Sequence, residues 1–316
     1  MTNLFTFQVN ISPGDILYAG IMVRELAQKH LSIPDRLLIV DCCKPKKTKM
    51  IDPDLRFPEP EFSLKVKLIS ELANQLLKEK LFTSVYFLKP GDEIFKIISK
   101  KYLNNIIKST HGAGATAQMA YWAGIELAST RYVIHYDGDM ILYQETGYKW
   151  WEEALKRMHL EDNVVMAVPR YSPPTTLTKN LPVYFVGTEI FAKDDYWVHN
   201  WFSTRIFLID KIKLQQFLPL VTGKIFFELL LRKILFRAFP LDPEIILFKK
   251  LGKAKSQRRL ILQSEKAWTL HPFSKPADYI KILSKILYNV NNNKFPTDQL
   301  GNEDIVLNAW VKFCNE

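Results

Sequence analysis

Short apolar runs alternate with helical patterns through the first half of the chain. The apolar runs over 5–11, 36–42, 84–88 and 131–136 predict strands, and the run over 36–42 is nearly continuous, as in a strand buried on both faces of a parallel sheet. Apolar residues at helical spacing predict helices over 15–30, 63–80, 93–108 and 115–129. Strands that alternate with helices indicate an α/β fold with right-handed crossovers.

The second half of the chain is less regular. Apolar runs predict strands over 164–169 and 204–209, and helical spacing predicts a helix from Lys211, an amphipathic segment over 225–239 and a capped helix over 301–313. Residues 171–182 are rich in proline and threonine and predict a loop, whereas residues 249–259 predict a basic, flexible segment. Since no repeat or linker interrupts the pattern, we expect one domain over 1–316, with halves over 1–145 and 146–316.

Composition and sequence pattern argue against a disordered, a secreted and a membrane-spanning protein. Of the 316 residues, 47% are hydrophobic and 24% are charged, so the chain has the apolar surface that a disordered protein lacks. The first residues do not have the pattern of a secretory signal, and no stretch reaches the roughly 20 apolar residues of a membrane span. Cys42, Cys43 and Cys314 are too few for a disulfide framework, which favours a reducing compartment. We therefore expect a cytoplasmic protein.

The net charge is strongly positive. Lys and Arg total 43 and Asp and Glu total 33, so the formal net charge is +10, which favours an anionic partner. The basic clusters over 44–49 and 249–259 lack the interleaved aromatic residues and the recognised module of a nucleic-acid-binding protein. We therefore expect no nucleic acid and favour contact with anionic lipid or an acidic polysaccharide.

Residues 225–239 predict a helix whose charged and apolar side chains gather on opposite sides. Its cations, Arg232, Lys233 and Arg237, suit anionic headgroups, and a helix of this kind can lie in a membrane interface. The same apolar side can equally pack into the protein core. The net charge and the basic segment over 249–259 favour a peripheral contact with the inner face of a membrane.

The sharpest chemical feature is Asp137-Gly138-Asp139, directly after a predicted strand. Ligands bind at the carboxyl ends of strands in sheets of this kind, and Asp41 also lies at such an end. Carboxylate oxygens are the ligands that Mg²⁺ and Mn²⁺ prefer. Spacing alone favours an ordinary polar turn, because Asp and Gly are turn residues. The apolar strand before the motif and the glycine-bearing loop upstream favour a metal site.

Residues 111–142, HGAGATAQMAYWAGIELASTRYVIHYDGDMIL, resemble the central segment of GT-A glycosyltransferases, especially those of family two. That segment has a glycine-containing loop, a helix with small residues, and an apolar strand that ends in an Asp-x-Asp (DxD) motif. The opening strand, helix and second strand, which ends in Asp41, also fit, so the resemblance covers about residues 5–145. It implies a GT-A fold with a nucleotide-sugar-binding half over 1–145 and an acceptor-binding half over 146–316.

The resemblance also implies roles for individual residues. The residues that it implicates in binding the nucleotide sugar are Asp41, Gly112, Gly114 and Asp137, and those that it implicates in binding Mn²⁺ or Mg²⁺ are Asp137 and Asp139. The cation would stabilise the charge that develops on the leaving diphosphate. Residues 41–45 replace the acidic-serine turn that is usual in the family, a departure that affects recognition of the base.

Two later segments are candidates for the rest of the site. Asp304, with Glu303, opens the predicted helix over 301–313, where inverting family-two enzymes have an acidic pair whose Asp is the catalytic base. Acids in this position are also typical of any helix start. His271, in WTLHPFSKP, loosely resembles the segment of retaining family-eight enzymes that supplies a metal ligand and binds the diphosphate. The pattern favours a loop histidine that hydrogen-bonds to the backbone, although a neutral His can complete a carboxylate metal site.

Aromatic residues gather at 196–202 and at Trp150 and Trp151. Aromatic faces stack on sugar rings, so these residues can border an acceptor pocket. The alternative is that they pack in the core.

Together these features predict a metal-dependent enzyme that transfers a sugar from a nucleotide sugar, most simply a UDP-sugar, to the hydroxyl of a glycan or lipid-linked acceptor. We expect inversion, with Asp304 as the base. One alternative is a retaining glycosyltransferase on the same fold, and another is a non-catalytic glycan- or membrane-surface-binding protein. A nucleotidyltransferase is a third, but residues 12–15 lack the glycine-rich loop with Arg or Lys that it needs.

Overall fold

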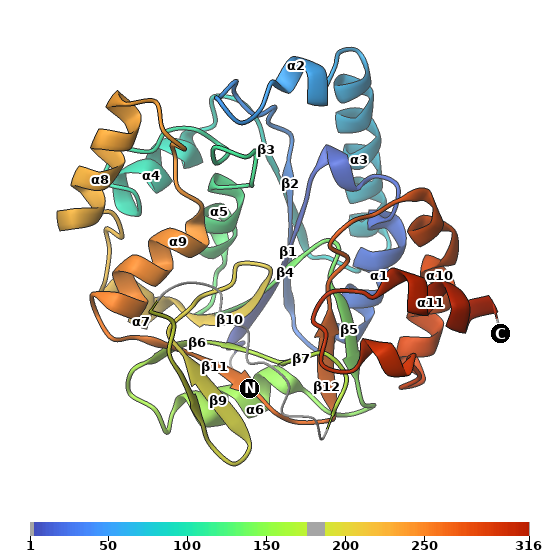
Figure 1. The fold of residues 1–316 in the computed structure, drawn as a ribbon. Coiled ribbons are helices and arrows are strands. Elements are labelled where there is room, and N and C mark those ends of the chain that lie inside the picture. Colours follow the sequence, from blue (N-terminus) through green and yellow to red (C-terminus); the bar gives the residue numbers. More distant parts are fainter. Residues whose placement is uncertain (1–2, 176–186, 316) are drawn as a thin grey trace.

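A nine-stranded mixed sheet forms the centre of the computed structural model, which describes residues 3–175 and 187–315 (Figure 1). Its strands lie in the order β3 (Ser84–Leu88), β2 (Asp35–Asp41), β1 (Phe5–Ile11), β4 (Tyr132–Asp137), β10 (Ile206–Asp210), β6 (Val164–Val168), β11 (Arg258–Leu262), β9 (Tyr196–His199) and β8 (Ile190–Ala192). The first four strands are parallel, and β10 joins β4 antiparallel. This arrangement confirms the predicted α/β fold.

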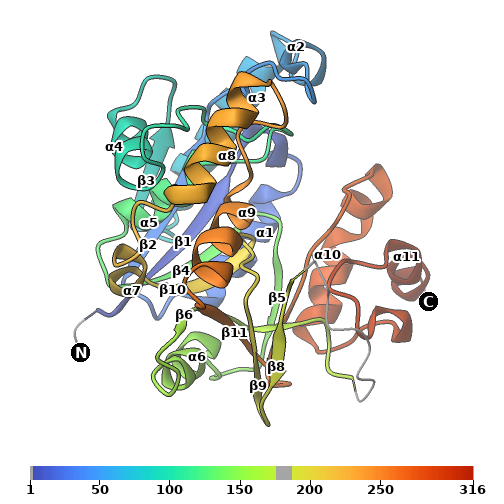
Figure 2. The same ribbon diagram turned by 60° about the vertical axis from the view of Figure 1, so that its left-hand side comes forward.

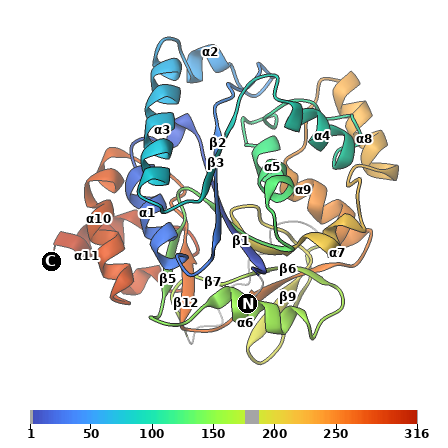
Figure 3. The same cartoon turned by 180° about the vertical axis from the view of Figure 1, so that it is seen from behind.

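Helices cover both faces of the parallel strands. α1 (Ala19–Lys29) and α3 (Glu61–Lys78) lie on one face, and α4 (Glu93–Lys101) and α5 (Met119–Leu127) lie on the other, as Figures 1 and 3 show from opposite sides. Because both faces are covered, β2 and β4 are nearly continuous buried runs. The strands predicted over 5–11 and 84–88 have the same bounds as β1 and β3.

A second sheet of three strands lies beside the first. It consists of β5 (Ile141–Gln144), β12 (Ala267–Leu270) and β7 (Arg170–Tyr171), and α10 (Ala277–Asn291) and α11 (Leu307–Asn315) pack beside it (Figure 1). The buried apolar side chains form two groups: a larger one around the main sheet, and a smaller one that includes Trp268, Tyr279 and Trp310. The turn over 137–139 connects β4 of the main sheet to β5 of the second sheet.

Three helices begin later than predicted. α1 begins at Ala19 rather than at 15, after a 3-10 turn over Pro13–Asp15, and α4 ends at Lys101 rather than at 108. α5 begins at Met119 rather than at 115, because residues 112–116 form a tight turn in which the Gly112 amide donates to the Thr116 carbonyl at 2.7 Å. α11 begins at Leu307 rather than at 301, because residues 303–305 pair with the backbone of His271. Part of the loop predicted over 171–182 lies outside the described residues, and Tyr171 belongs to β7.

The prediction of a flexible basic segment over 249–259 is wrong. α9 (Pro243–Leu247) continues into a π-helical turn over Phe248–Lys253, and β11 follows. Arg259 is fully buried and donates to the Tyr171 hydroxyl at 2.7 Å, while Lys250 donates to the Thr222 hydroxyl at 2.7 Å. These basic side chains therefore serve the packing of the second half rather than an exposed surface.

Further α-helices complete the part of the chain that the structure describes. They are α2 (Pro53–Arg56), α6 (Trp150–Met158), α7 (Lys211–Gln215) and α8 (Gly223–Ile234). Among the residues that the structure describes, no helix has both the length and the apolar character needed to cross a membrane.

Candidate functional site

Three neighbouring strands end at one edge of the main sheet, and acidic side chains gather there. In the parallel register Asn10 of β1 lies opposite Asp137 of β4, and Ile11 lies opposite Val40 of β2, one residue before Asp41. A cavity of about 160 Å³ opens at this edge, and the acids that line it are Asp15, Asp41, Asp137 and Asp139. We call it the carboxylate cavity. The topology thus brings together the two strand ends that the sequence analysis singled out.

Gly138 allows the DxD turn to lie against β1. Its amide donates to the Asn10 carbonyl at 2.9 Å. A Cβ atom at this position would lie 2.7 Å from Cγ2 of Ile11, closer than real Cβ atoms approach, and 3.0 Å from the Asn10 carbonyl oxygen, a tight contact. Any larger residue would therefore push the turn, with both of its carboxylates, away from β1.

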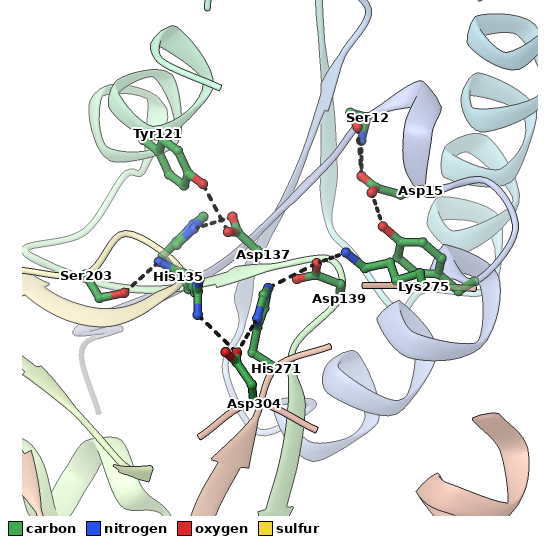
Figure 4. A network of polar contacts seen from close by, with 12 residues as sticks. Ser12, Asp15, Tyr121, His135, Asp137, Asp139, Ser203, His271, Lys275 and Asp304 are labelled. Carbon is green, nitrogen blue, oxygen red and sulfur yellow. Dashed lines mark hydrogen bonds and ion pairs between the residues drawn. The ribbon is translucent and has the colours of Figure 1, made fainter. Parts of the chain in front are cut away.

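Asp137 contacts polar groups of helix α5 and strand β4. It accepts a hydrogen bond from the Tyr121 hydroxyl at 3.0 Å, and its other oxygen lies 3.3 Å from Nε2 of His135 (Figure 4). His135 in turn lies 2.5 Å from Oε1 of Gln8 through Nδ1, and burial lowers the pKa of His135 to about 3. Burial, and then the charge of Asp139, raise the pKa of Asp137 well above its ordinary value.

Asp139 contacts two residues that follow strand β12 of the second sheet, His271 and Lys275. Its Oδ2 lies 2.6 Å from Nζ of Lys275 and 3.6 Å from Nε2 of His271 (Figure 4). Burial alone would raise the pKa of Asp139, but the hydrogen bond with His271 and the charge of Lys275 outweigh it and lower that pKa to about 2. Its Oδ1 is buried and has no hydrogen-bond partner. A buried anionic oxygen without a hydrogen-bond partner favours the binding of a cation or of a hydrogen-bond donor.

His271 follows β12 directly and lies between two carboxylates. Its Nδ1 lies 2.9 Å from Oδ1 of Asp304, while its Nε2 faces Asp139. Burial lowers the pKa of His271, but the hydrogen bonds with Asp139 and Asp304 outweigh it, and the pKa is raised above its ordinary value. The interpretation of His271 as a loop histidine satisfied by the backbone is therefore wrong.

Asp304 does not lie in the first turn of a helix. It is three residues before Leu307, where α11 begins. The prediction that Glu303 and Asp304 open this helix is therefore wrong, and both the interpretation as ordinary acids of a helix start and the resemblance to the acidic pair of inverting enzymes rested on it. Nη1 of Arg205 lies 3.5 Å from Oδ1 of Asp304. The hydrogen bond from His271 lowers the pKa of Asp304, despite its partial burial.

His271 lines a second cavity, of about 270 Å³. We call it the aromatic cavity. Besides His271 its walls include Tyr171, Trp201, Arg205, Glu244 and Glu303. Its wall contains Trp201 from the aromatic segment over 196–202, most of which forms strand β9. Trp150 and Trp151 are fully buried in the core, as the alternative interpretation predicted.

Asp41 lies deep in the carboxylate cavity. The Cys43 amide donates to its Oδ1 at 2.9 Å, and its Oδ2 lies 3.7 Å from Nε2 of His111. Burial raises the pKa of Asp41, and the nearby His111 opposes that effect. Asp41 thus stays close to the loop over 111–117, whose Ala117 also lines the cavity.

The two glycines of that loop are not part of the cavity walls. Neither cavity, as the described residues form it, is lined by Gly112 or Gly114. A Cβ atom on Gly112 would lie 2.6 Å from Oδ1 of Asp242, and Gly114 approaches Met50. The packing calls for a glycine at Gly112 alone of the two, because a Cβ atom on Gly114 would make an ordinary contact with Met50 at 4.0 Å.

Sequence reasoning missed several residues of the site. Arg205 precedes β10, Tyr171 ends β7 and Thr269 lies in β12, and all three line the aromatic cavity. No motif marks them. Lys275 belongs to the segment WTLHPFSKP. Its contact with Asp139 places this segment at the site, which the spacing of residues within the segment did not indicate.

The donor groups around Asp139 fit a hard divalent cation. Over residues 3–175 and 187–315, no three Cys, His, Asp or Glu side chains already form a metal-binding group. The buried, unpartnered Oδ1 of Asp139 nevertheless lies in a cavity with Asp137, and His271 is within 3.6 Å of the same carboxylate. Carboxylate oxygens with one imidazole nitrogen are suitable ligands for Mn²⁺ or Mg²⁺.

Comparison with known proteins adds little to this geometry. No model of a known family matches the chain, and no curated protein matches its sequence. A similar solved structure is that of a galactosyltransferase, LgtC, in complex with donor and acceptor sugar analogues. The match has a TM-score of 0.38 and 11% sequence identity and covers 98% of this chain and 95% of that chain.

Proposed function

We propose that the chain is a metal-dependent glycosyltransferase of the GT-A fold that transfers a sugar from a nucleotide sugar, most simply a UDP-sugar, to an acceptor hydroxyl. One observation carries the proposal: Asp139, His271 and Asp304 come from three separate segments and meet at the carboxyl end of β4. The location is where sheets of this kind bind their ligands.

The two cavities support a division of the chain into two halves. Every residue that lines the carboxylate cavity lies within 1–145, and the aromatic cavity is lined by residues of 146–316 with the exception of Met140. We assign the first to the nucleotide sugar, with Asp41 near its base or ribose. We assign the second to the acceptor, since its Trp201 and Tyr171 can contact a sugar ring and its carboxylates can accept hydrogen bonds from hydroxyl groups.

The residues around Asp139 would bind and stabilise the diphosphate. Asp137, Asp139 and His271 would hold Mn²⁺ or Mg²⁺, which when bound stabilises negative charge on the leaving diphosphate. Lys275 brings a second positive charge to the same place, because its ammonium group already contacts Asp139. Both charges lie in a buried site, where electrostatic stabilisation is stronger than in water.

Asp304 is our candidate for the base. Its lowered pKa keeps it ionised at neutral pH, and it lies beside Glu303 and Arg205 on the border of the aromatic cavity. In an inverting reaction the acceptor oxygen forms its bond to the anomeric carbon while the bond from that carbon to the diphosphate oxygen breaks. The acceptor proton would pass to Asp304.

A retaining reaction is the second candidate, and the arrangement of His271 and Lys275 favours it. Both contact Asp139, and the carboxylate of Asp304 is already engaged by His271. The loose resemblance of their segment to family-eight enzymes implies a metal ligand and diphosphate binding there. The configuration of the anomeric carbon in the product, measured by NMR, distinguishes the two reactions.

The proposal is tested with a panel of nucleotide sugars, each with and without Mn²⁺. A donor at 100 times its dissociation constant stabilises a protein by about 2.7 kcal/mol, which thermal shift detects. We expect one donor to stabilise the protein only with the metal and to release a nucleoside diphosphate. Release of pyrophosphate would instead indicate a nucleotidyltransferase. If no donor stabilises the protein and none is turned over, a non-catalytic protein of the same fold is favoured.

A further inference from the structure

α8 presents an apolar face to solvent. Ile225 and Leu229 are its buried residues. Its large apolar side chains on the other side are exposed, with Phe227 at 64%, and Phe236, just after the helix, is exposed at 73%. In Figure 2 the helix stands at the outside of the molecule. The alternative, that the apolar side of residues 225–239 packs into the core, is therefore wrong for most of that side.

Basic residues surround this apolar face. Lys224, Arg232 and Arg237 share a shallow hollow with Phe227 and Leu231 of α8. The acid within the helix, Glu228, is neutralised, since it pairs with Arg232 at 3.0 Å and also contacts Lys249. The exposed face therefore combines apolar side chains with a net positive charge.

A second hollow, of about 390 Å³, continues the face beyond the end of α8. Lys47, Lys49 and Lys233 lie around an apolar wall that includes Met50 and Phe236. Lys47 also pairs with Asp52 at 2.5 Å, so part of its charge is neutralised. Most of the positive charge of this hollow is therefore assigned to Lys49 and Lys233. The loop over 46–50 and α8 thus form one surface, although they are far apart in the sequence. We call it the α8 surface.

The α8 surface adjoins the candidate site. Phe239 lines its second hollow, and Asp242, three residues later, lines the aromatic cavity. The loop between them is tied in place, because the Ala113 amide donates to the Pro240 carbonyl at 3.3 Å and the Thr48 hydroxyl donates to the Ala113 carbonyl at 2.7 Å. A partner on the α8 surface would therefore lie close to the segment that supplies Asp242 to the wall of the aromatic cavity.

We propose that the α8 surface docks the protein on an anionic phospholipid membrane. Phe227, Leu231 and Phe236 enter the interface, and Lys49, Lys233 and Arg237 contact the headgroups. Charge complementarity selects this partner: the cations suit anionic headgroups, and the apolar side chains suit the acyl boundary beneath them. A second copy of the chain fits less well, because a symmetric contact would bring the same cations together.

Docking does not depend on the proposed reaction. Its one consequence that rests on the proposed function is that the acceptor is lipid-linked, and so reaches the aromatic cavity from the membrane side. Vesicle binding, measured without any donor, tests docking alone, whereas the donor panel described above tests the reaction alone.

The experiment is co-sedimentation of the full chain with vesicles of phosphatidylcholine, with and without phosphatidylserine. We expect binding to the anionic vesicles alone, and weaker binding at high salt. The triple variant Lys49→Gln/Lys233→Gln/Arg237→Gln should bind about 100-fold more weakly, at about fivefold for each cation near the surface. A second triple variant, Phe227→Ser/Leu231→Ser/Phe236→Ser, should also lose most of its binding.

Two control variants carry the same changes on other surfaces. They are Lys67→Gln/Lys156→Gln/Lys281→Gln and Leu31→Ser/Leu68→Ser/Leu160→Ser, all at exposed positions. Both should bind like the wild type. The proposal is overturned if the folded wild type fails to bind anionic vesicles at low salt, or if the controls lose as much binding as the test variants. A dimer in light scattering that the serine variant dissociates would overturn it in favour of a second copy.

Discussion

The side chains of His271 and Asp304 form a hydrogen bond of 2.9 Å between Nδ1 and Oδ1, and the same two residues form a β-bridge through their backbones. Asp304 therefore fixes the plane of the imidazole ring. It also leaves Nε2 as the nitrogen that faces Asp139. Carboxylates that orient a histidine in this way are typical of metal sites, where they set the tautomer of the ligand.

Loss of the Asp139 carboxylate should abolish metal-dependent donor binding. Asp139→Ala removes the anionic oxygens that the cation requires, and Asp137→Ala should weaken donor binding too. Titration calorimetry with the donor, with and without Mn²⁺, measures the effect, and the exposed Asp278→Ala is the matched control. Turnover at the wild-type rate in both site variants would show that the metal-site assignment is wrong.

Two substitutions at Asp304 separate a base from a residue that only orients His271. Asp304→Asn keeps an oxygen that accepts the hydrogen bond from Nδ1 but cannot take up a proton, whereas Asp304→Ala loses both functions. If Asp304 is the base, both variants should lose about 100-fold or more in turnover, with little change in donor binding. Wild-type turnover in Asp304→Asn, with a loss in Asp304→Ala alone, would indicate an orienting role.

The buried side chain of Gln299 holds the Asp304 segment in place. Its Oε1 accepts from the Trp310 indole at 2.8 Å, and its Nε2 donates to the Asp304 carbonyl at 3.0 Å. Gln299→Leu leaves these groups without partners, so we expect the free energy of unfolding to fall by about 2 kcal/mol or more. Urea unfolding measures the loss, and Gln75→Leu, at an exposed position, should change stability little. Equal effects of the two substitutions would contradict the assignment.

Stability should fall in acid because His30 is buried in its neutral form. Its Nδ1 donates to the Leu26 carbonyl at 2.7 Å, and its Nε2 lies 3.2 Å from the Tyr136 hydroxyl. Burial lowers the pKa of His30 to about 3, whereas in the unfolded chain that pKa is about 6.5. The unfolded state therefore binds an extra proton below pH 6.5, and stability is lost as the pH falls from there toward 3.

The size of this effect follows from the two pKa values. Between about pH 7.5 and about pH 5.5, one such histidine lowers the free energy of unfolding by about 1.4 kcal/mol. Urea unfolding at the two pH values should show a pH dependence smaller by about that amount in His30→Gln, whatever the stability of the variant at neutral pH. Identical pH dependence in wild type and variant would mean that His30 does not carry the effect.

The parallel half of the fold could be predicted because its signals are local. A strand covered on both faces must be apolar along its whole length, and this pattern placed β2 and β4 within a residue of their bounds. The same rule placed Asp41 and Asp137 at strand ends. That both carboxylates lie in one cavity then follows from the parallel order of the strands.

The second half could not be predicted in this way, because its site residues are placed by long-range contacts. Asp304 has the local sequence of a helix start, yet pairing with His271 takes its backbone out of the helix. Arg205 and Tyr171 reach the aromatic cavity only through the packing of two sheets, and nothing in their neighbours indicates it. The buried Arg259 looked like part of an exposed basic segment because its partner, the Tyr171 hydroxyl, is far away in the sequence.

The turn over residues 137–139 lies between the larger and the smaller group of buried apolar side chains. β4, before it, packs in the larger group, while Ile141 of β5, after it, packs with Trp268 and Trp310 in the smaller group. Thr269 and His271 of the aromatic cavity alternate along the chain with Trp268 and Leu270 of the smaller group, so changes in that group can shift these two residues while the strands that bear Asp41 and Asp137 stay in place. For the proposed glycosyltransferase, the acceptor can therefore change in evolution while the residues assigned to the nucleotide sugar are retained.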